Sequence, residues 1–294
     1  MGPGATSRLP AAPADWELVG TEGLGPFITR AAYRRPDGAR VEWTSRRHRK
    51  GQGVRVVAAP AGVEAPPRAQ VPRRTWWIAG LFSVGSICFA LGAWPAYVDR
   101  VSGRVDGLTF FVGSVFFTCA SYLCFVEAAN SPGAIGDQPA RRLRHRLAAG
   151  RPHSIDWWAT LIQLVGTLYF NVMTFRTLHD NWSASEEDRL VWRPDVIGSI
   201  CFLVASYLAW AEVCHGIGRL RLRDLSWWIV VLNLLGSAFF GLSAIGAFAD
   251  PDTGDVTNLR WDNGGTILGA VCFLVAAVML VPEARATSTP AATT

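Results

Sequence analysis

The chain has 294 residues, of which 50% are hydrophobic and 17% charged, and its formal net charge is +5. A typical soluble domain carries roughly 25% charged residues, so this composition argues against a water-soluble protein and favours a lipid bilayer.

The N-terminal region is predicted to hold a small β-type element. Residues 1–14 are expected to be disordered, with neither the charged start nor the apolar run of a secretory signal peptide. Within residues 15–57, the partly apolar stretch 26–35 precedes the turn signal Pro36-Asp37-Gly38, and period-two alternation resumes at Val41. These features predict a β-hairpin.

A basic cluster follows this element and consists of Arg46, Arg47, Arg49 and Lys50. It could contact anionic lipid headgroups, at about 1 kcal/mol per basic residue near the surface. The alternatives are that it only fixes the membrane topology or forms a solvated face, or that it binds nucleic acid, a partner we do not expect. Residues 58–73 are rich in Pro and Ala and are predicted to be a linker without fixed structure.

Six stretches have no charge in their interiors and are predicted to be transmembrane helices. With their flanking residues where needed, they are about long enough to cross a hydrocarbon core of about 30 Å. They lie at 76–97, 107–126, 157–175, 196–211, 227–248 and 264–282. Taken in pairs they form helical hairpins at 74–130, 154–215 and 224–285, followed by a disordered tail at 286–294. The predicted fold class is therefore an all-α membrane protein of three tandem, parallel hairpins.

Basic residues predict the orientation, because loops that stay in the cytoplasm are enriched in Lys and Arg. With the N-terminus inside, the inner segments hold 22 of the 28 basic residues and the outer loops hold six. Both termini are thus expected in the cytoplasm. The basic residues are almost all Arg, a bias that we interpret as that of a bacterial genome, so the inner membrane is the expected location.

An internal repeat is the strongest signal in the chain. The first helix of each hairpin starts with a Trp pair and has a Gly nine residues after the first Trp, and the second helix has a Gly followed fourteen residues later by a Glu. Each Gly is followed four residues later by a Phe. Small residues let helix backbones approach closely in lipid. The predicted packing positions are Gly85, Ser86, Gly113, Ser114, Gly166, Gly198, Ser199, Gly236, Ser237 and Gly269.

This unit of Trp-Trp, two Gly-Ser-x-x-Phe motifs and Ala-Ser-Tyr-Leu resembles the YrhK-like domain, a two-helix bacterial membrane module often found in tandem. The resemblance covers residues 74–284. It implies the hairpin fold and no established activity. The third copy departs most, since it has Ala276, Ala277, Val278 and Met279 where the others have Ala-Ser-Tyr-Leu.

Two sets of polar residues are candidates for a polar or ion site. Glu127, Glu212 and Glu283 lie nearly four helical turns after a packing Gly, so they could form a carboxylate ring; alternatively they cap helix ends and pair with Arg neighbours such as Arg285. Uncharged amides also enter the spans and could line a polar path, or form interhelical hydrogen bonds worth about 0.6 kcal/mol each. They are Gln163, Asn171 and Asn233.

The sequence predicts no catalytic, metal or cofactor site, because no Cys/His spacing or nucleophile motif is present. The cysteines lie in or beside the spans, so no disulfide is expected. The favoured function is a non-catalytic scaffold or interaction module in the bilayer. The alternative is a small-solute or ion transporter or channel that uses the six-helix bundle, and a membrane enzyme is the third hypothesis.

Overall fold

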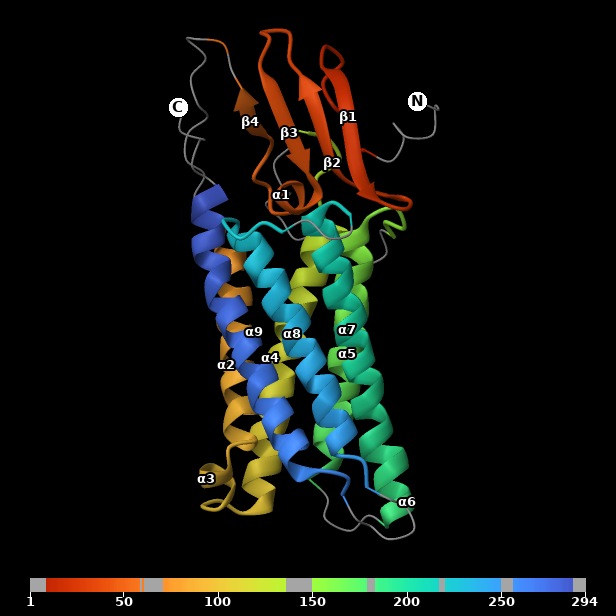
Figure 1. Ribbon diagram of the computed structural model, residues 1–294, viewed down its shortest axis with the longest axis vertical. Helices are drawn as coiled ribbons and strands as arrows, with labels where there is room; N and C mark the ends of the chain where they lie inside the picture. Colours follow the sequence, from red (N-terminus) through yellow and green to blue (C-terminus); the bar gives the residue numbers. More distant parts are fainter. Residues whose placement is uncertain are drawn as a thin grey trace.

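The computed structural model describes residues 9–58, 60, 71–135, 150–178, 183–216, 220–249 and 256–287. A long bundle of helices carries a small β-sheet at one end (Figure 1). We call this end of the bundle the sheet end and the opposite end the far end. Most of the segments predicted to be disordered or linker, 1–14, 58–73 and 286–294, lie outside the described residues.

The N-terminal element is a four-stranded antiparallel sheet, which confirms a small β-type element and extends the predicted hairpin. Its order is β1 (Glu17–Leu24), β2 (Phe27–Arg34), β3 (Arg40–Thr44) and β4 (Arg55–Ala58). Burial alternates along β2 and β3, as expected for strands with one face packed on a core.

Alternate side chains of β2 and β3 form the core of the sheet domain. Tyr33, Val41 and Trp43 are all at most 5% exposed. Ile135, from the segment after the second long helix, packs against them, and its backbone N–H donates to Ala11 O at 2.8 Å. The sheet domain therefore buries part of its core against a loop of the bundle.

A short helix, α1 (Ser45–Arg49), follows β3 directly and lies between the sheet and the bundle (Figure 1). Its buried His48 packs beside Trp43, with ring centroids 5.6 Å apart, and its Nε2 lies 2.9 Å from Pro132 O. These contacts hold α1 at the sheet end, with its basic residues next to the helix ends.

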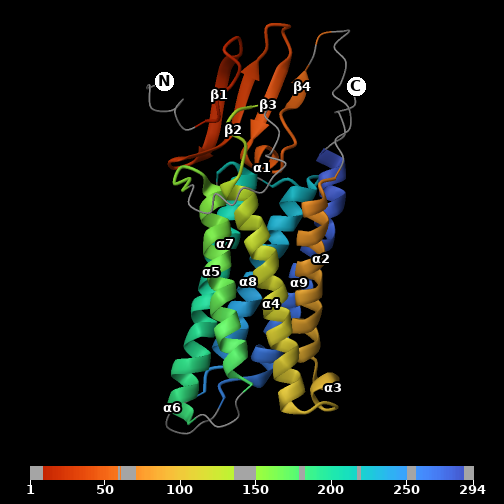
Figure 2. The same ribbon diagram turned by 180° about the vertical axis from the view of Figure 1, so that it is seen from behind.

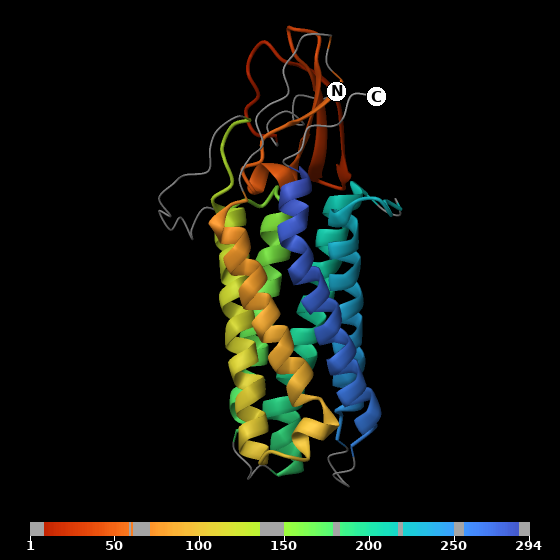
Figure 3. The same cartoon turned by 90° about the vertical axis from the view of Figure 1, so that its left-hand side faces the viewer.

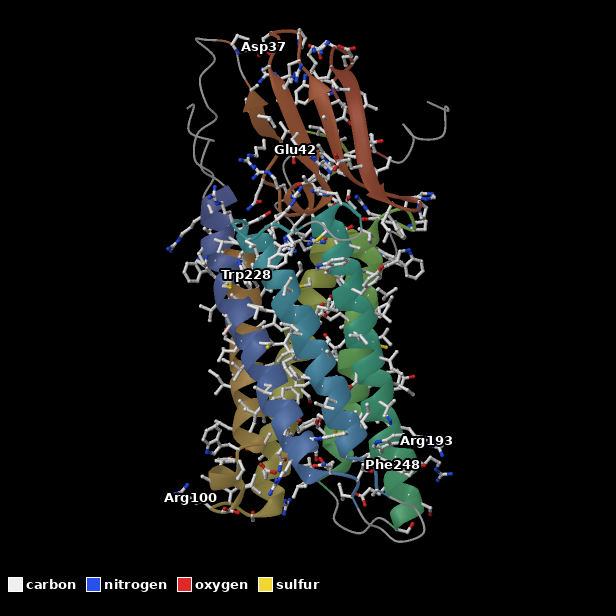
Figure 4. The ribbon with its side chains drawn as sticks, in the orientation of Figure 1. Asp37, Glu42, Arg100, Arg193, Trp228 and Phe248 are labelled. Carbon is white, nitrogen blue, oxygen red and sulfur yellow. The ribbon has the colours of Figure 1, made fainter. Side chains whose placement is uncertain are left out.

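Six long helices form the bundle, and within the described residues all six are long and apolar enough to cross a membrane, as predicted. Outward-facing Val, Leu and Ile side chains along them stay exposed, as a lipid-facing surface requires. Exposed tryptophans lie at both ends of the bundle, such as Trp228 near the sheet end (Figure 4) and Trp94 at the far end. The helices are α2 (Arg73–Gly92), α4 (Gly103–Ala129), α5 (Ile155–Arg176), α7 (Arg193–Cys214), α8 (Leu225–Gly246) and α9 (Leu259–Thr287).

Several predicted helix ends were wrong, among them ends of the first, fourth and sixth spans. The first span stops at Gly92, because Trp94 is extended before Pro95, which starts the short helix α3 (Pro95–Val98). The fourth is longer than predicted, since α6 (Ala184–Glu187) and a π-helical turn η2 (Asp188–Trp192) lead into α7. In the sixth, Pro282 lies inside α9 instead of ending the span.

The six helices close into a ring in which each packs against two neighbours. The order around the ring is α2, α4, α5, α7, α8 and α9, and α9 packs back against α2. Figure 2 shows α5 and α4 on the rear face, and Figure 3 shows α2 and α9 side by side. Each helix therefore presents one face to the axis of the bundle.

A layer of phenylalanines fills that axis, with one ring from each helix. The neighbouring ring centroids lie 5.2–6.5 Å apart, mostly in the tilted or edge-to-face arrangements that aromatic pairs prefer. All six rings are at most 6% exposed and leave a void of about 10 Å³. We call this set the phenylalanine layer: Phe89, Phe117, Phe170, Phe202, Phe240 and Phe273.

Glycines let the paired helices approach closely. A Cβ at Gly85 would contact Phe117 and lie 2.9 Å from Gly113 O on α4. The same relation recurs between α5 and α7, at Gly166 and Gly198, and between α8 and α9, where a Cβ at Gly236 would lie 3.0 Å from the facing carbonyl oxygen. Hydroxyl pairs join α4 to α5 and α7 to α8 instead: Ser114 and Thr174 at 2.9 Å, and Ser206 and Ser237 at 2.8 Å.

Candidate functional site

Four carboxylates gather at the sheet end of the bundle. Glu127, Glu212 and Glu283 come from the ends of α4, α7 and α9, and Asp156 comes from the first turn of α5. The glutamates face inward because fourteen residues is nearly four helical turns from the Gly that faces the neighbouring helix. Glu212 and Glu283 are each only 2% exposed.

Arg49 of α1 lies at the centre of this group. Its Nη1 is 3.0 Å from Asp156 Oδ2 and 3.6 Å from Glu212 Oε2, and its Nε is 3.6 Å from Glu127 Oε1. Burial lowers the pKa of the Arg49 guanidinium, but the three carboxylates raise it more, so the net pKa lies above its ordinary value. One buried arginine therefore contacts three helices of the bundle.

Glu283 forms the second half of the site. Its Oε1 accepts from Arg46 Nε at 2.8 Å and from Ser226 Oγ at 2.6 Å, and its Oε2 accepts from Lys50 Nζ at 2.5 Å. Burial and the charge of Arg46 lower the pKa of Lys50 more than Glu283 raises it. We call the set Arg46, Arg49, Lys50, Glu127, Asp156, Glu212 and Glu283 the ion-pair cluster.

A serine adds a neutral contact to the cluster. Ser45 Oγ, at the start of α1, donates to Glu212 Oε1 at 2.7 Å. The cluster has three basic groups and four carboxylates, so its charges nearly balance. Near balance is what a buried charge network needs to offset the desolvation of its members.

The predicted headgroup contact is wrong for three of the four basic residues. The side chains of Arg46, Arg49 and Lys50 are 14%, 10% and 10% exposed and face carboxylates of the bundle instead of a lipid surface. Arg47 leaves the cluster, and its Nη2 donates to Gln52 O at 3.2 Å. The error has a physical cause, because a basic run pairs with the nearest buried carboxylates in preference to a hydrated headgroup.

Arg285, the suggested partner of the glutamates, contacts an aromatic ring. Its guanidinium carbon lies 5.7 Å from the centre of the Trp76 ring, in a cation–π arrangement. The glutamates therefore do not form an open carboxylate ring, because α1 supplies their cations.

A cavity of about 130 Å³ lies between the ion-pair cluster and the phenylalanine layer. Gln163 and Asn233, the two amides that follow Trp pairs, both line it, together with Thr160 and Ser206. Asn171 lies elsewhere and donates from Nδ2 to Thr118 Oγ1 at 2.9 Å. The structure thus brings two of the three predicted amides close to the glutamates and uses the third between α5 and α4.

The sheet has a second polar contact with the bundle at the end of α7. Thr29 Oγ1 of β2 lies 3.0 Å from Nδ1 of His215, and both side chains are buried. His215 has a left-handed backbone, with φ of 52°, where the helix ends. Burial, together with the charges of Arg221 and Arg30, lowers the pKa of His215 to about 4.

Sequence reasoning missed Asp156 and Ser226 as members of the site. Both stand immediately before a Trp pair, and Thr75 has the corresponding place before Trp76 and Trp77. The polar residue before each Trp pair was therefore the feature of the sequence that could have identified these members of the site. Asp156 also accepts a hydrogen bond from Ser154 Oγ, which orients it toward α1.

No family model, curated protein or solved structure matches this chain. The resemblance of residues 74–284 to the YrhK-like domain accordingly gains no support and stays a prediction.

Proposed function

We propose that the protein is a non-catalytic membrane platform that holds its N-terminal sheet in a fixed position on the bundle. The ion-pair cluster is the observation that carries this proposal. Through Arg49, Arg46 and Lys50, the short helix α1 contacts carboxylates from α4, α5, α7 and α9. A sheet tied to four of the six helices cannot move independently of the bundle.

The energetics of buried charges favour a positional role for the cluster. Removing one partner of a buried ion pair typically costs about 3–5 kcal/mol, whereas replacing the whole pair by apolar residues is often neutral. A buried ion-pair network thus contributes little net stability, but it strongly favours the one arrangement of the chain in which every charge has its partner. In this protein the selected arrangement is the position of α1 against the end of the bundle.

The phenylalanine layer argues for a platform over an open channel. Six rings from six helices close the axis and leave a void of only about 10 Å³, about the least volume that can hold one water molecule. Between this layer and the sheet, the ion-pair cluster covers the end of the bundle. A solute would have to displace both.

We assign the sheet end to the cytoplasm and the bundle to a bacterial inner membrane, on the bias of basic residues toward that end. We also interpret the bundle as three tandem hairpin units. Each pair α2–α4, α5–α7 and α8–α9 has facing glycines, and each contributes two rings to the phenylalanine layer. A parallel repeat of this kind gives three helix ends where carboxylates meet α1.

A flux measurement tests the platform. The purified protein is reconstituted in liposomes under a proton or K⁺ gradient, beside the triple variant Glu127→Gln, Glu212→Gln, Glu283→Gln and empty liposomes. We expect no flux above empty liposomes from folded wild type. Flux that the triple variant abolishes would overturn the platform and make the glutamates a transport site.

A labelling experiment tests the topology. Asp37→Cys, at the tip of the sheet (Figure 4), is made in a chain whose other cysteines have been replaced. If the sheet lies in the cytoplasm, this thiol should not react with a membrane-impermeant thiol reagent in intact cells.

A transporter is the second candidate function, and one observation favours it. Cavities lie on both sides of the phenylalanine layer: the 130 Å³ cavity toward the sheet end and one of about 470 Å³ toward the far end. Rotation of the rings would connect them. The same liposomes distinguish the candidates, because a transporter must give flux of its solute.

A further inference from the structure

We infer that the far-end cavity is a binding site for an organic cation, a small molecule with an ammonium group and an apolar body. The inference is independent of the platform function, since it concerns the opposite end of the bundle. The cavity has a volume of about 470 Å³, within the range of roughly 300–1,000 Å³ that small-molecule sites occupy.

Aromatic side chains form the floor and one wall of this cavity. The floor is the far side of the phenylalanine layer, where Phe89, Phe170 and Phe240 face the cavity. Trp192 lines the wall, and its position is fixed because its Nε1 donates to Ala244 O at 2.8 Å and its ring lies 4.9 Å from that of Phe248. Aromatic faces attract cations, and more strongly where water is excluded.

The remaining charge of the cavity is negative. Asp106, Asp195 and Asp262 come from α4, α7 and α9, and no Arg, Lys or His is present among the described lining residues. Asp188 also lines the cavity, but Arg193 neutralises it from outside at 2.9 Å. The three aspartates and Glu187, which also lines the cavity, thus have no basic partner among the described lining residues.

The aspartates are held in place without a basic partner from the described residues. Asp262 Oδ1 accepts from Ser243 Oγ at 2.9 Å. Asp195 is partly buried and lines the same cavity as Asp262. One oxygen of Asp106, Oδ1, is buried and accepts no hydrogen bond from the described residues. A buried carboxylate oxygen without a donor is costly unless a ligand supplies one.

The chemistry favours an organic cation over a metal ion. The described Asp, Glu, His and Cys side chains form no group of three that could hold a metal. Ca²⁺ would need about 6–8 oxygen ligands, whereas much of this wall is aromatic. An ammonium group can donate to the aspartates while its apolar body contacts the phenylalanine layer.

Calorimetry on the purified full chain tests the site, with benzylammonium, the protonated form of benzylamine, as the probe and benzyl alcohol as its neutral counterpart. The key variant is Asp195→Asn with Asp262→Asn. The matched control is Asp99→Asn, an exposed aspartate near the far end that does not line the cavity. We expect the probe to bind wild type and the control alike, and to bind the double variant at least tenfold more weakly.

Three results would overturn the inference: no binding of the probe to wild type, equal binding to the double variant, or equal binding of benzyl alcohol. Binding of CaCl₂ that excludes the probe would show a metal site in its place. If the double variant does not fold, Asp106→Asn replaces it, because its side chain has no hydrogen bond to lose at Oδ1. The same tenfold loss is expected.

Discussion

Nη1 of Arg49 lies 3.0 Å from Oδ2 of Asp156, and this contact joins the short helix under the sheet to the first turn of a membrane helix. The two side chains are 10% and 3% exposed, so the pair is buried. Glu127 and Glu212 contact the same guanidinium. The position of the sheet on the bundle therefore depends on Arg49 more than on any other residue of the ion-pair cluster.

Arg49→Ala should lower the free energy of unfolding by about 3–5 kcal/mol, because it leaves three buried carboxylates without their cation. Unfolding of the purified protein in detergent measures the change. Arg34→Ala is the control, since Arg34 pairs with Glu17 at 3.0 Å with side chains 46% and 66% exposed. That exposed pair should contribute about 1 kcal/mol or less. Equal losses in the two variants would mean that the cluster is not buried in solution.

Glu283→Gln should also destabilise the protein, because Arg46 and Lys50 would then repel each other in a buried site. Replacing all three residues by Met should recover most of the loss, since apolar side chains of similar size need no charge partner. The measurement is the unfolding free energy of the single and triple variants. A triple variant less stable than Glu283→Gln would show that the network itself stabilises the fold.

Two glycines of α2 should respond in opposite ways to alanine. A Cβ at Gly85 would contact Phe117 and lie 2.9 Å from Gly113 O, so Gly85→Ala should cost about 1–3 kcal/mol by forcing α2 and α4 apart. A Cβ at Gly80 meets nothing within 4 Å, so Gly80→Ala should be neutral or stabilising by up to about 1 kcal/mol. Thermal unfolding of both variants tests this, and a loss at Gly80 equal to that at Gly85 would contradict the packing.

Stability should fall as pH decreases from 6.5 toward 4, in part through His215. Its pKa is lowered to about 4 in the folded state, so the unfolded chain binds the proton more tightly and protonation favours unfolding. At pH 5 the loss from this residue is about 2 kcal/mol relative to neutral pH. His215→Asn keeps a residue that tolerates the left-handed backbone and does not titrate. The unfolding free energy of that variant should depend less on pH, and an unchanged pH dependence would contradict the assignment.

The spans and their packing positions could be predicted because they follow from local patterns. Charge-free stretches identified all six helices, and the Gly positions lie where paired helices meet. The residues at which the helices begin and end were harder to predict. The stop at Gly92 depends on Pro95, and the π-helical turn before Arg193 gave no pattern that distinguishes it from an α-helix.

The pairing of Arg49 with three carboxylates could not be predicted, since it depends on where the sheet lies on the bundle. A basic run is locally compatible with lipid, water or carboxylates, and only the contacts of His48 with Pro132 and Trp43 orient α1. The glutamates were singled out by their spacing, but the partner that satisfies them comes from a distant part of the chain.

Hydrogen exchange of wild type against the triple variant Glu127→Gln, Glu212→Gln, Glu283→Gln tests most directly whether the ion-pair cluster holds the sheet on the bundle. We predict that amides of α1 and β3 exchange at least tenfold faster in the variant, while amides around the phenylalanine layer stay protected. Equal protection of α1 and β3 in both proteins would contradict the platform, because the sheet would then keep its place without the cluster.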